Sequence, residues 1–219
     1  MTDTQLNPND FIIARKRKKY RFALFSNAEN CFEFQEWPRT HLPNLTVELG
    51  AGTALFSVEL AHRHPDRNFI AIDVKADRLQ KGAARAIELG LKNIWFVRAR
   101  ADQLLEVVAE NSVHELWLTF SDPFPRDRDA KRRLTSPRFL GVYKTALIRD
   151  GVVRQKTDSH ALFDWSLEQY VSNRWSIQEV SYDLHDSALS DDYKILTTYE
   201  EKWLHEGLTT YYVAAMVPK

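Results

Sequence analysis

Five acidic residues stand at or just after the ends of five successive apolar segments, and this pattern is the first sign of chemistry in the chain. They are Glu48, Asp73, Asp102, Asp122 and Asp158. The segments in front of them have the length and composition of β-strands. Ligands of parallel sheets bind at the edge formed by the carboxyl ends of the strands. Any one acid is ordinary in a loop, but the joint pattern predicts a ligand site lined by carboxylates.

The first acid belongs to a glycine turn between an expected strand, 45–49, and an expected helix, 54–64. Gly50 and Gly52 allow a sharp turn that lets a ligand lie against the backbone. The third glycine of a dinucleotide fingerprint is absent, and Glu48 would repel a pyrophosphate. A carboxylate at this point suits a ligand with an ammonium group, such as the amino acid end of S-adenosylmethionine.

The elements that must position these acids alternate along the chain, and hydrophobic periodicity gives their bounds. Strands are expected at 45–49, 68–74, 93–98, 115–120, 152–157, 175–184 and 209–217. Helices are expected at 54–64, 76–89, 100–110, 137–148, 160–172 and 197–205. This alternation predicts an α/β, doubly wound, Rossmann-like sheet. Asp73 then lies 21 residues after Gly52, where such sheets place an acid that meets ribose hydroxyls.

Charge is balanced overall but clustered locally. The 219 residues contain 30 Lys and Arg and 30 Asp and Glu, so no global field selects a polyanion. Residues 15–21 nevertheless hold six cations in seven positions, and residues 126–133 hold five in eight. Such clusters can bind phosphates. The candidate contacts to an RNA backbone are Arg15, Lys16, Arg17, Lys18, Lys19, Lys131, Arg132 and Arg133.

Composition limits the remaining possibilities. The chain is 44% hydrophobic, which suits one core, so we expect one domain at 44–219 preceded by a basic arm and packing segment at 1–43. A single cysteine, Cys31, excludes an intramolecular disulfide and argues against a metal site. No signal segment or membrane-spanning run is visible, so a soluble, cytoplasmic protein is expected.

A specific motif follows the fourth acid. The chain reads Ser121-Asp122-Pro123-Phe124-Pro125-Arg126, then Lys131-Arg132-Arg133. It resembles the bacterial tRNA (guanine-N7-)-methyltransferase family, whose pattern is Pro-Asp-Pro-Trp-Pro-Lys followed by Lys-Arg-Arg. The resemblance extends through Thr157-Asp158 to Thr197-Thr198-Tyr199-Glu200 and covers roughly residues 44–219. The chain departs from the family pattern at Ser121, at Phe124 and at Arg100, where the family has an acid.

The resemblance implies a class I methyltransferase sheet, mostly parallel with an antiparallel last strand. It also implies methyl transfer from S-adenosylmethionine to N7 of a guanosine in the variable loop of tRNA, with Asp122 between cofactor and base as the catalytic residue. The cofactor would meet Glu48, Gly50, Gly52, Asp73, Asp122, and either Arg100 or Asp102. The guanosine side would be met by Arg126, Asp158, Thr197, Thr198, Tyr199 and Glu200.

Three other functions remain open from the sequence. An adenine-amine methyltransferase is one, although its Asn/Asp-Pro-Pro-aromatic motif differs from Asp122-Pro123-Phe124-Pro125 by one position. A second is an RNA-binding protein of the same fold with weak or no catalysis, for which Arg100 and the two motif departures argue. A nicotinamide-dependent oxidoreductase is disfavoured by Glu48 and the missing glycine. The oligomeric state, monomer or homodimer, is open.

Overall fold

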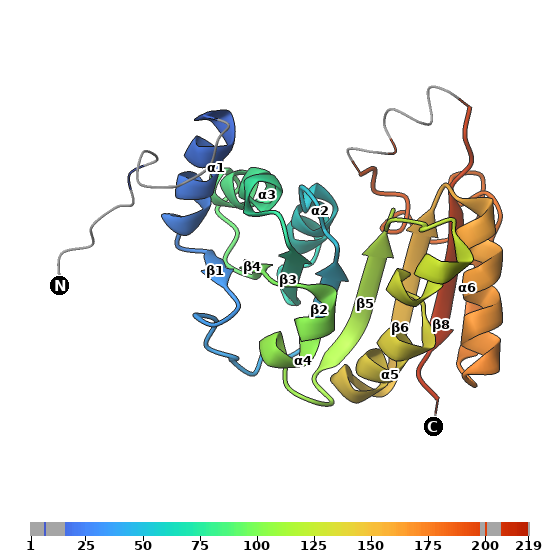
Figure 1. The fold of residues 1–219 in the computed structure, drawn as a ribbon. Helices are drawn as coiled ribbons and strands as arrows, with labels where there is room; N and C mark the ends of the chain where they lie inside the picture. The colour runs from blue at the N-terminus through green and yellow to red at the C-terminus, as the bar shows by residue number, and fades with distance from the viewer. Residues whose placement is uncertain (1–6, 8–15, 198–199, 201–206, 219) are drawn as a thin grey trace.

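One eight-stranded sheet organises the protein (Figure 1). The structure is a computed structural model that describes residues 7, 16–197, 200 and 207–218, with side chains from residue 19 in the first helix. The strand order is β1-β4-β3-β2-β5-β6-β8-β7. The strands are β1 (Cys31–Glu33), β2 (Leu45–Leu49), β3 (Asn68–Asp73), β4 (Ile94–Arg98), β5 (Val113–Thr119), β6 (Leu147–Thr157), β7 (Ser176–Ser181) and β8 (Tyr211–Met216).

Helices cover both faces of the sheet, as expected for a doubly wound fold. The α-helices are α1 (Lys16–Ser26), α2 (Leu55–Arg63), α3 (Ala76–Glu88), α4 (Leu104–Val107), α5 (Pro137–Ala146) and α6 (His160–Ser172). Short 3₁₀ turns, η2 (Ala101–Gln103) and η3 (Asp127–Arg132), lie in the loops after β4 and β5. One hydrophobic core packs α4, α5 and α6 against the sheet, and a second packs α1, α2 and α3, which lie side by side in Figure 1.

The central strand β2 shows how the sequence places the first acid. All five of its residues are buried, as expected for a strand covered on both faces. Leu45, Val47 and Leu49 enter the core under α4 and α5, because alternate side chains point to opposite faces. Glu48 therefore points to the other face, toward α2.

The chain order creates a crevice beside β2. The chain runs from β2 through β3 to β4 on one side and then crosses to β5 on the other. Such a topological switch point is where open α/β sheets bind ligands. The strand β8 pairs antiparallel with both β6 and β7, while β2 to β6 pair in parallel. The doubly wound sheet with an antiparallel last strand is thus confirmed.

The N-terminal segment adds a strand that the sequence did not indicate. β1 extends the sheet by pairing in parallel with β4, with Cys31 opposite Phe96. Three residues are too few for a strand period to be visible in the sequence. Further along the chain, the strand expected at 175–184 is shorter, at 176–181. The helix expected at 197–205 lies mostly outside the described residues.

Gly82 controls how closely α3 approaches the glycine turn. A Cβ at this position would lie 2.6 Å from the Thr53 carbonyl oxygen and 2.9 Å from the Phe96 ring. We predict that Gly82→Ala lowers the free energy of unfolding by about 1–3 kcal/mol, since helix and turn must separate. The control is Gly141→Ala on α5, where the space is open and the change should stabilise by roughly 0.5–1 kcal/mol. Equal urea midpoints for Gly82→Ala and the wild type would contradict the packing described.

Candidate active site

A cavity of about 790 Å³ opens at the carboxyl edge of the sheet, next to the switch point. Its wall brings together loops that follow β2, β3, β4 and β5. Six of the residues expected at the cofactor or the guanosine line it: Glu48, Gly50, Gly52, Asp73, Asp122 and Thr197. The cavity therefore unites the first, second and fourth acids of the sequence pattern with the glycine turn.

The glycine turn and Asp73 form one rigid rim of the cavity. Gly50 and Gly52 have φ angles of +73° and +56°, a backbone region that favours glycine. The Gly52 N–H donates to one Asp73 carboxylate oxygen at 2.8 Å, and the Lys75 N–H donates to the other at 2.8 Å. Two backbone amides thus fix the carboxylate, which still faces the cavity.

Glu48 is a buried acid with polar but uncharged partners. It is 2% exposed and accepts hydrogen bonds from Ser57 Oγ and Thr119 Oγ1, both at 2.5 Å. Burial raises the pKa of Glu48 to about 7, although the two hydroxyls and the Lys156 ammonium partly oppose the shift. In the part of the chain that the structure describes, no cation forms an ion pair with it. A bound ammonium group would favour its ionised form.

The loop that carries Asp122 is strained. Phe120 and Phe124 have φ angles of 49° and 42°, which are costly for residues with a large side chain. Asp122 lies between them, is exposed, and lines the cavity. Such strain persists only where the surroundings impose it, and here a neighbouring guanidinium does so.

Arg133 supplies that constraint. It is only 7% exposed, and it donates to the carbonyl oxygens of Pro123 at 3.1 Å and Phe124 at 3.0 Å. Its guanidinium also lies 4.5 Å from the centre of the Trp165 ring. The expected contact with an RNA backbone is therefore replaced, in this structure, by a buried contact that shapes the Asp122 loop. Its neighbours Lys131 and Arg132 are exposed.

A buried ion pair anchors the last segment of the cavity wall. Lys156 Nζ is fully buried and lies 2.8 Å from Glu200, and it also donates to the Ile195 carbonyl at 2.9 Å. Glu200 accepts from the Thr197 N–H at 2.8 Å and donates its own N–H to Thr197 Oγ1 at 3.2 Å, as in a capping box. The side chain expected to touch the guanosine is thus buried and holds Thr197 at the cavity.

The charge on Glu200 is well compensated. Burial opposes ionisation, but the hydrogen bond from His185 and the Lys156 ammonium outweigh it and hold the pKa of Glu200 below its usual range.

Besides Glu200, four residues expected at the cofactor or the guanosine lie outside the cavity wall. Asp102 forms two hydrogen bonds with Arg100, at 2.9 and 2.7 Å, and one with Arg138 at 3.0 Å. The Arg100 guanidinium, followed by Arg138, holds the pKa of Asp102 below its usual range. Ala99 and Ala101, on either side of Arg100, do line the cavity. Arg126 and Asp158 are exposed and not among the lining residues.

Some predictions fall where the structure gives no side-chain information. Arg15, Thr198 and Tyr199 lie outside the described residues, and the side chains of Lys16, Arg17 and Lys18 are not described. Lys19 is half-buried and does not line the cavity.

Residues that the sequence pattern did not single out also line the cavity. They include three cations and an acid, Lys75, Asp77, Arg78 and Lys81, and Arg21 of the basic cluster at 15–21 lines the cavity as well. The signal was present, because Lys75, Arg78 and Lys81 recur at three-residue spacing along α3. Among the described residues, no group of His, Cys, Asp and Glu is arranged to hold a metal ion, and no helix is long and apolar enough to cross a membrane.

Comparison with known proteins adds independent findings. A family model described as a putative methyltransferase matches residues 43–213. A tRNA (guanine-N(7)-)-methyltransferase of Brevibacillus brevis is 40% identical over 77% of this chain and 78% of its own length. One of Bacteroides fragilis is 33% identical over 93% of this chain and 87% of its own.

Solved structures show the same fold at low sequence identity. The 16S rRNA methyltransferase KamB has a TM-score of 0.62 at 17% identity, over 83% of this chain and 91% of that one. The 16S rRNA (adenine(1408)-N(1))-methyltransferase of Catenulisporales acidiphilia has a TM-score of 0.57 at 12% identity, over 100% and 96%. The strand order, the antiparallel β8 and the cavity at the switch point define a class I methyltransferase. With its relatives taken into account, the chain belongs to the tRNA (guanine-N(7)-)-methyltransferase family.

The Lys156–Glu200 pair gives a stability prediction. We expect Lys156→Met to lower the free energy of unfolding by about 3–5 kcal/mol, because it leaves a buried carboxylate without its cation. Adding Glu200→Gln removes that stranded charge, so the double variant should lose much less than the sum of the two single losses. Urea denaturation of the four proteins of this cycle measures the coupling. Losses that add within about 0.5 kcal/mol would show that the two groups are independent.

Proposed function

We propose that the protein transfers a methyl group from S-adenosylmethionine to N7 of a guanosine in tRNA, with the variable loop as the target region. The observation that carries this proposal is one cavity that holds Glu48 and Asp73 on one side and Asp122, on its strained loop, on the other. The family relationship supports the reaction and argues against both the adenine-amine and the non-catalytic alternatives.

The residues of the cavity fit a cationic nucleoside cofactor. Glu48 is a buried acid without a paired cation among the residues that the structure describes, and the ammonium group of S-adenosylmethionine would supply one. Asp73 presents a fixed carboxylate of the kind that binds ribose hydroxyls. Gly50 and Gly52 leave the backbone of the turn open to the ligand. Ala99 and Ala101 line the same cavity, whereas Arg100 and Asp102 bond to each other, so neither of these two is assigned to the adenine.

The reaction requires no general base to remove a proton from the attacking nitrogen. S-adenosylmethionine supplies an electrophilic methyl group on a sulfonium. Guanine N7 has a free lone pair, so a N–C bond forms, the C–S bond breaks, and the sulfur keeps its electron pair. No proton leaves N7. The ring gains positive charge, which a carboxylate at Asp122 stabilises while it orients the base through N1–H and the 2-amino group.

Other residues support the bound tRNA in this proposal. Thr197 contacts the target nucleoside from the cavity wall, and Glu200 contributes by fixing Thr197. Arg126, Asp158, Thr198 and Tyr199 are assigned to the guanosine side by family resemblance. The exposed cations Lys131 and Arg132, together with the Arg15–Lys19 run, are assigned to RNA phosphates.

Methyl transfer to unmodified tRNA tests the proposal. We predict that the wild type forms 7-methylguanosine and that Asp122→Asn lowers kcat about 10²–10³-fold, as for loss of one charge-stabilising group. Labelled S-adenosylmethionine gives the rate, and mass analysis of the nucleosides identifies the product. Asp127→Asn is the matched control, because Asp127 is an exposed acid of the same loop outside the cavity. A methylated adenosine, or equal rates for the two variants, would contradict the proposal.

A further inference from the structure

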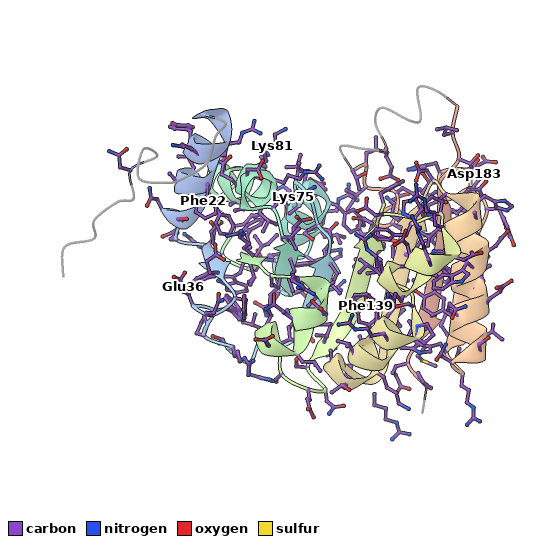
Figure 2. All side chains as sticks on the ribbon, viewed as in Figure 1. Phe22, Glu36, Lys75, Lys81, Phe139 and Asp183 are labelled. Carbon is purple, nitrogen blue, oxygen red and sulfur yellow. The ribbon has the colours of Figure 1, made fainter. Side chains whose placement is uncertain are left out.

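A group of cations lines the cavity together with its acids. Arg21 on α1 and Lys75, Arg78 and Lys81 on or beside α3 all line it. Lys75 and Lys81 are labelled in Figure 2, where they lie along α3 beside the helix α1. We refer to Lys75, Arg78 and Lys81 as the α3 stripe.

The stripe occupies the solvent face of α3. Its members are three residues apart and are all exposed, so they lie on one side of the helix. The opposite side is buried through residues such as Leu79 and Ala83, which pack into the core. The stripe therefore contributes little to holding the helix in place.

The exposed side chains of the stripe are not engaged by acids of the part of the chain that the structure describes. Within the described residues, none of its members forms an ion pair, whereas Arg85, one turn further along, pairs with Glu88 at 3.1 Å. Arg100 likewise pairs with Asp102 at 2.7 Å. Asp77 lies within the same stretch of chain and also lines the cavity, as do Asp73 and Asp122. Among the described residues, the cations of the stripe nevertheless remain outside any ion pair.

The charge and the position of the stripe indicate that its partner is a polyanion. The cofactor proposed above is cationic and is met by the buried acids Glu48 and Asp73. A polyanion that enters from solvent must pass the exposed stripe. On the other side of the loop region, Arg132 lines the same cavity and lies 4.2 Å from the Phe124 ring. Cations thus flank the opening through which the target nucleoside reaches Asp122.

We propose that the α3 stripe, with Arg21, binds the phosphodiester backbone of the tRNA strand that flanks the target guanosine. The inference rests on the proposed function. The α3 stripe is distinct from the two basic clusters of the sequence, and Arg21 belongs to the first of them, at residues 15–21. Phosphate contacts position an RNA without reading its bases, which suits exposed Lys and Arg side chains. Release of counterions makes such contacts strongly dependent on salt.

The test compares Arg78→Ala/Lys81→Ala with the wild type in binding to unmodified tRNA at several salt concentrations. Alanine suits both positions, which are exposed and helical. We expect the Kd for tRNA to rise about tenfold and the slope of log K against log salt to fall by roughly 1 to 2. The Kd for S-adenosylmethionine should stay within about twofold of the wild type.

The matched control is Lys144→Ala/Arg149→Ala. It removes two exposed cations near the amino end of β6, whereas the cavity lies at the carboxyl ends of the strands. It should leave the tRNA affinity and its salt slope unchanged. A stripe variant with an unaltered salt slope would overturn the inference. So would a stripe variant that loses S-adenosylmethionine but not tRNA, since the cations would then serve the cofactor. If the wild type itself neither binds nor methylates tRNA, the proposed function fails, and the inference fails with it.

Discussion

The site depends on a buried carboxylate, that of Glu48, which forms no ion pair within the described residues. Glu48 lies near the end of the central strand at the topological switch point and accepts hydrogen bonds from the hydroxyls of Ser57 and Thr119. The buried ammonium of Lys156 is the available counter-charge, but it is committed to Glu200. Burying an acid in this way is unfavourable, and the raised pKa of Glu48 expresses that cost. A cationic ligand that binds beside Glu48 would offset the cost of burying its carboxylate.

Around that carboxylate, the protein separates charges by depth. The acids Glu48 and Asp73 are buried where the cofactor is proposed to bind, and the cations of the α3 stripe are exposed where the RNA must approach. Between them, the Asp122 loop is held in a strained conformation by the guanidinium of Arg133. Since catalysis at N7 needs position and charge more than proton transfer, a rigid acid is more useful at this point than a titrating base.

The sequence predicted the parts of this design that depend on local patterns. The order of the central strands, the glycine turn and the gathering of Glu48, Asp73 and Asp122 followed from periodicity and from the rule for strand ends, whereas β6 begins five residues earlier than expected and β7 is shorter. Long-range partners were not visible. The sequence predicted Arg133 as one of several surface cations. In the structure its partners are Trp165 and two loop carbonyls, which are separated from it along the chain. The sequence predicted Glu200 as a contact to the guanosine. In the structure it pairs in the core with Lys156, which lies 44 residues earlier in the chain. Asp102 similarly met Arg138 only through folding.

Calorimetry of S-adenosylmethionine binding at pH 6.5, in two buffers of different ionisation enthalpy, tests the central role of Glu48 most directly. With a pKa of about 7, most Glu48 side chains carry a proton at this pH, while the amino group of the cofactor is already charged. Binding should therefore release protons from the wild type. Glu48→Gln should bind more weakly and release none. Equal affinity and equal proton release for the two proteins would show that the buried carboxylate does not receive the ammonium group, and would contradict the central role of Glu48.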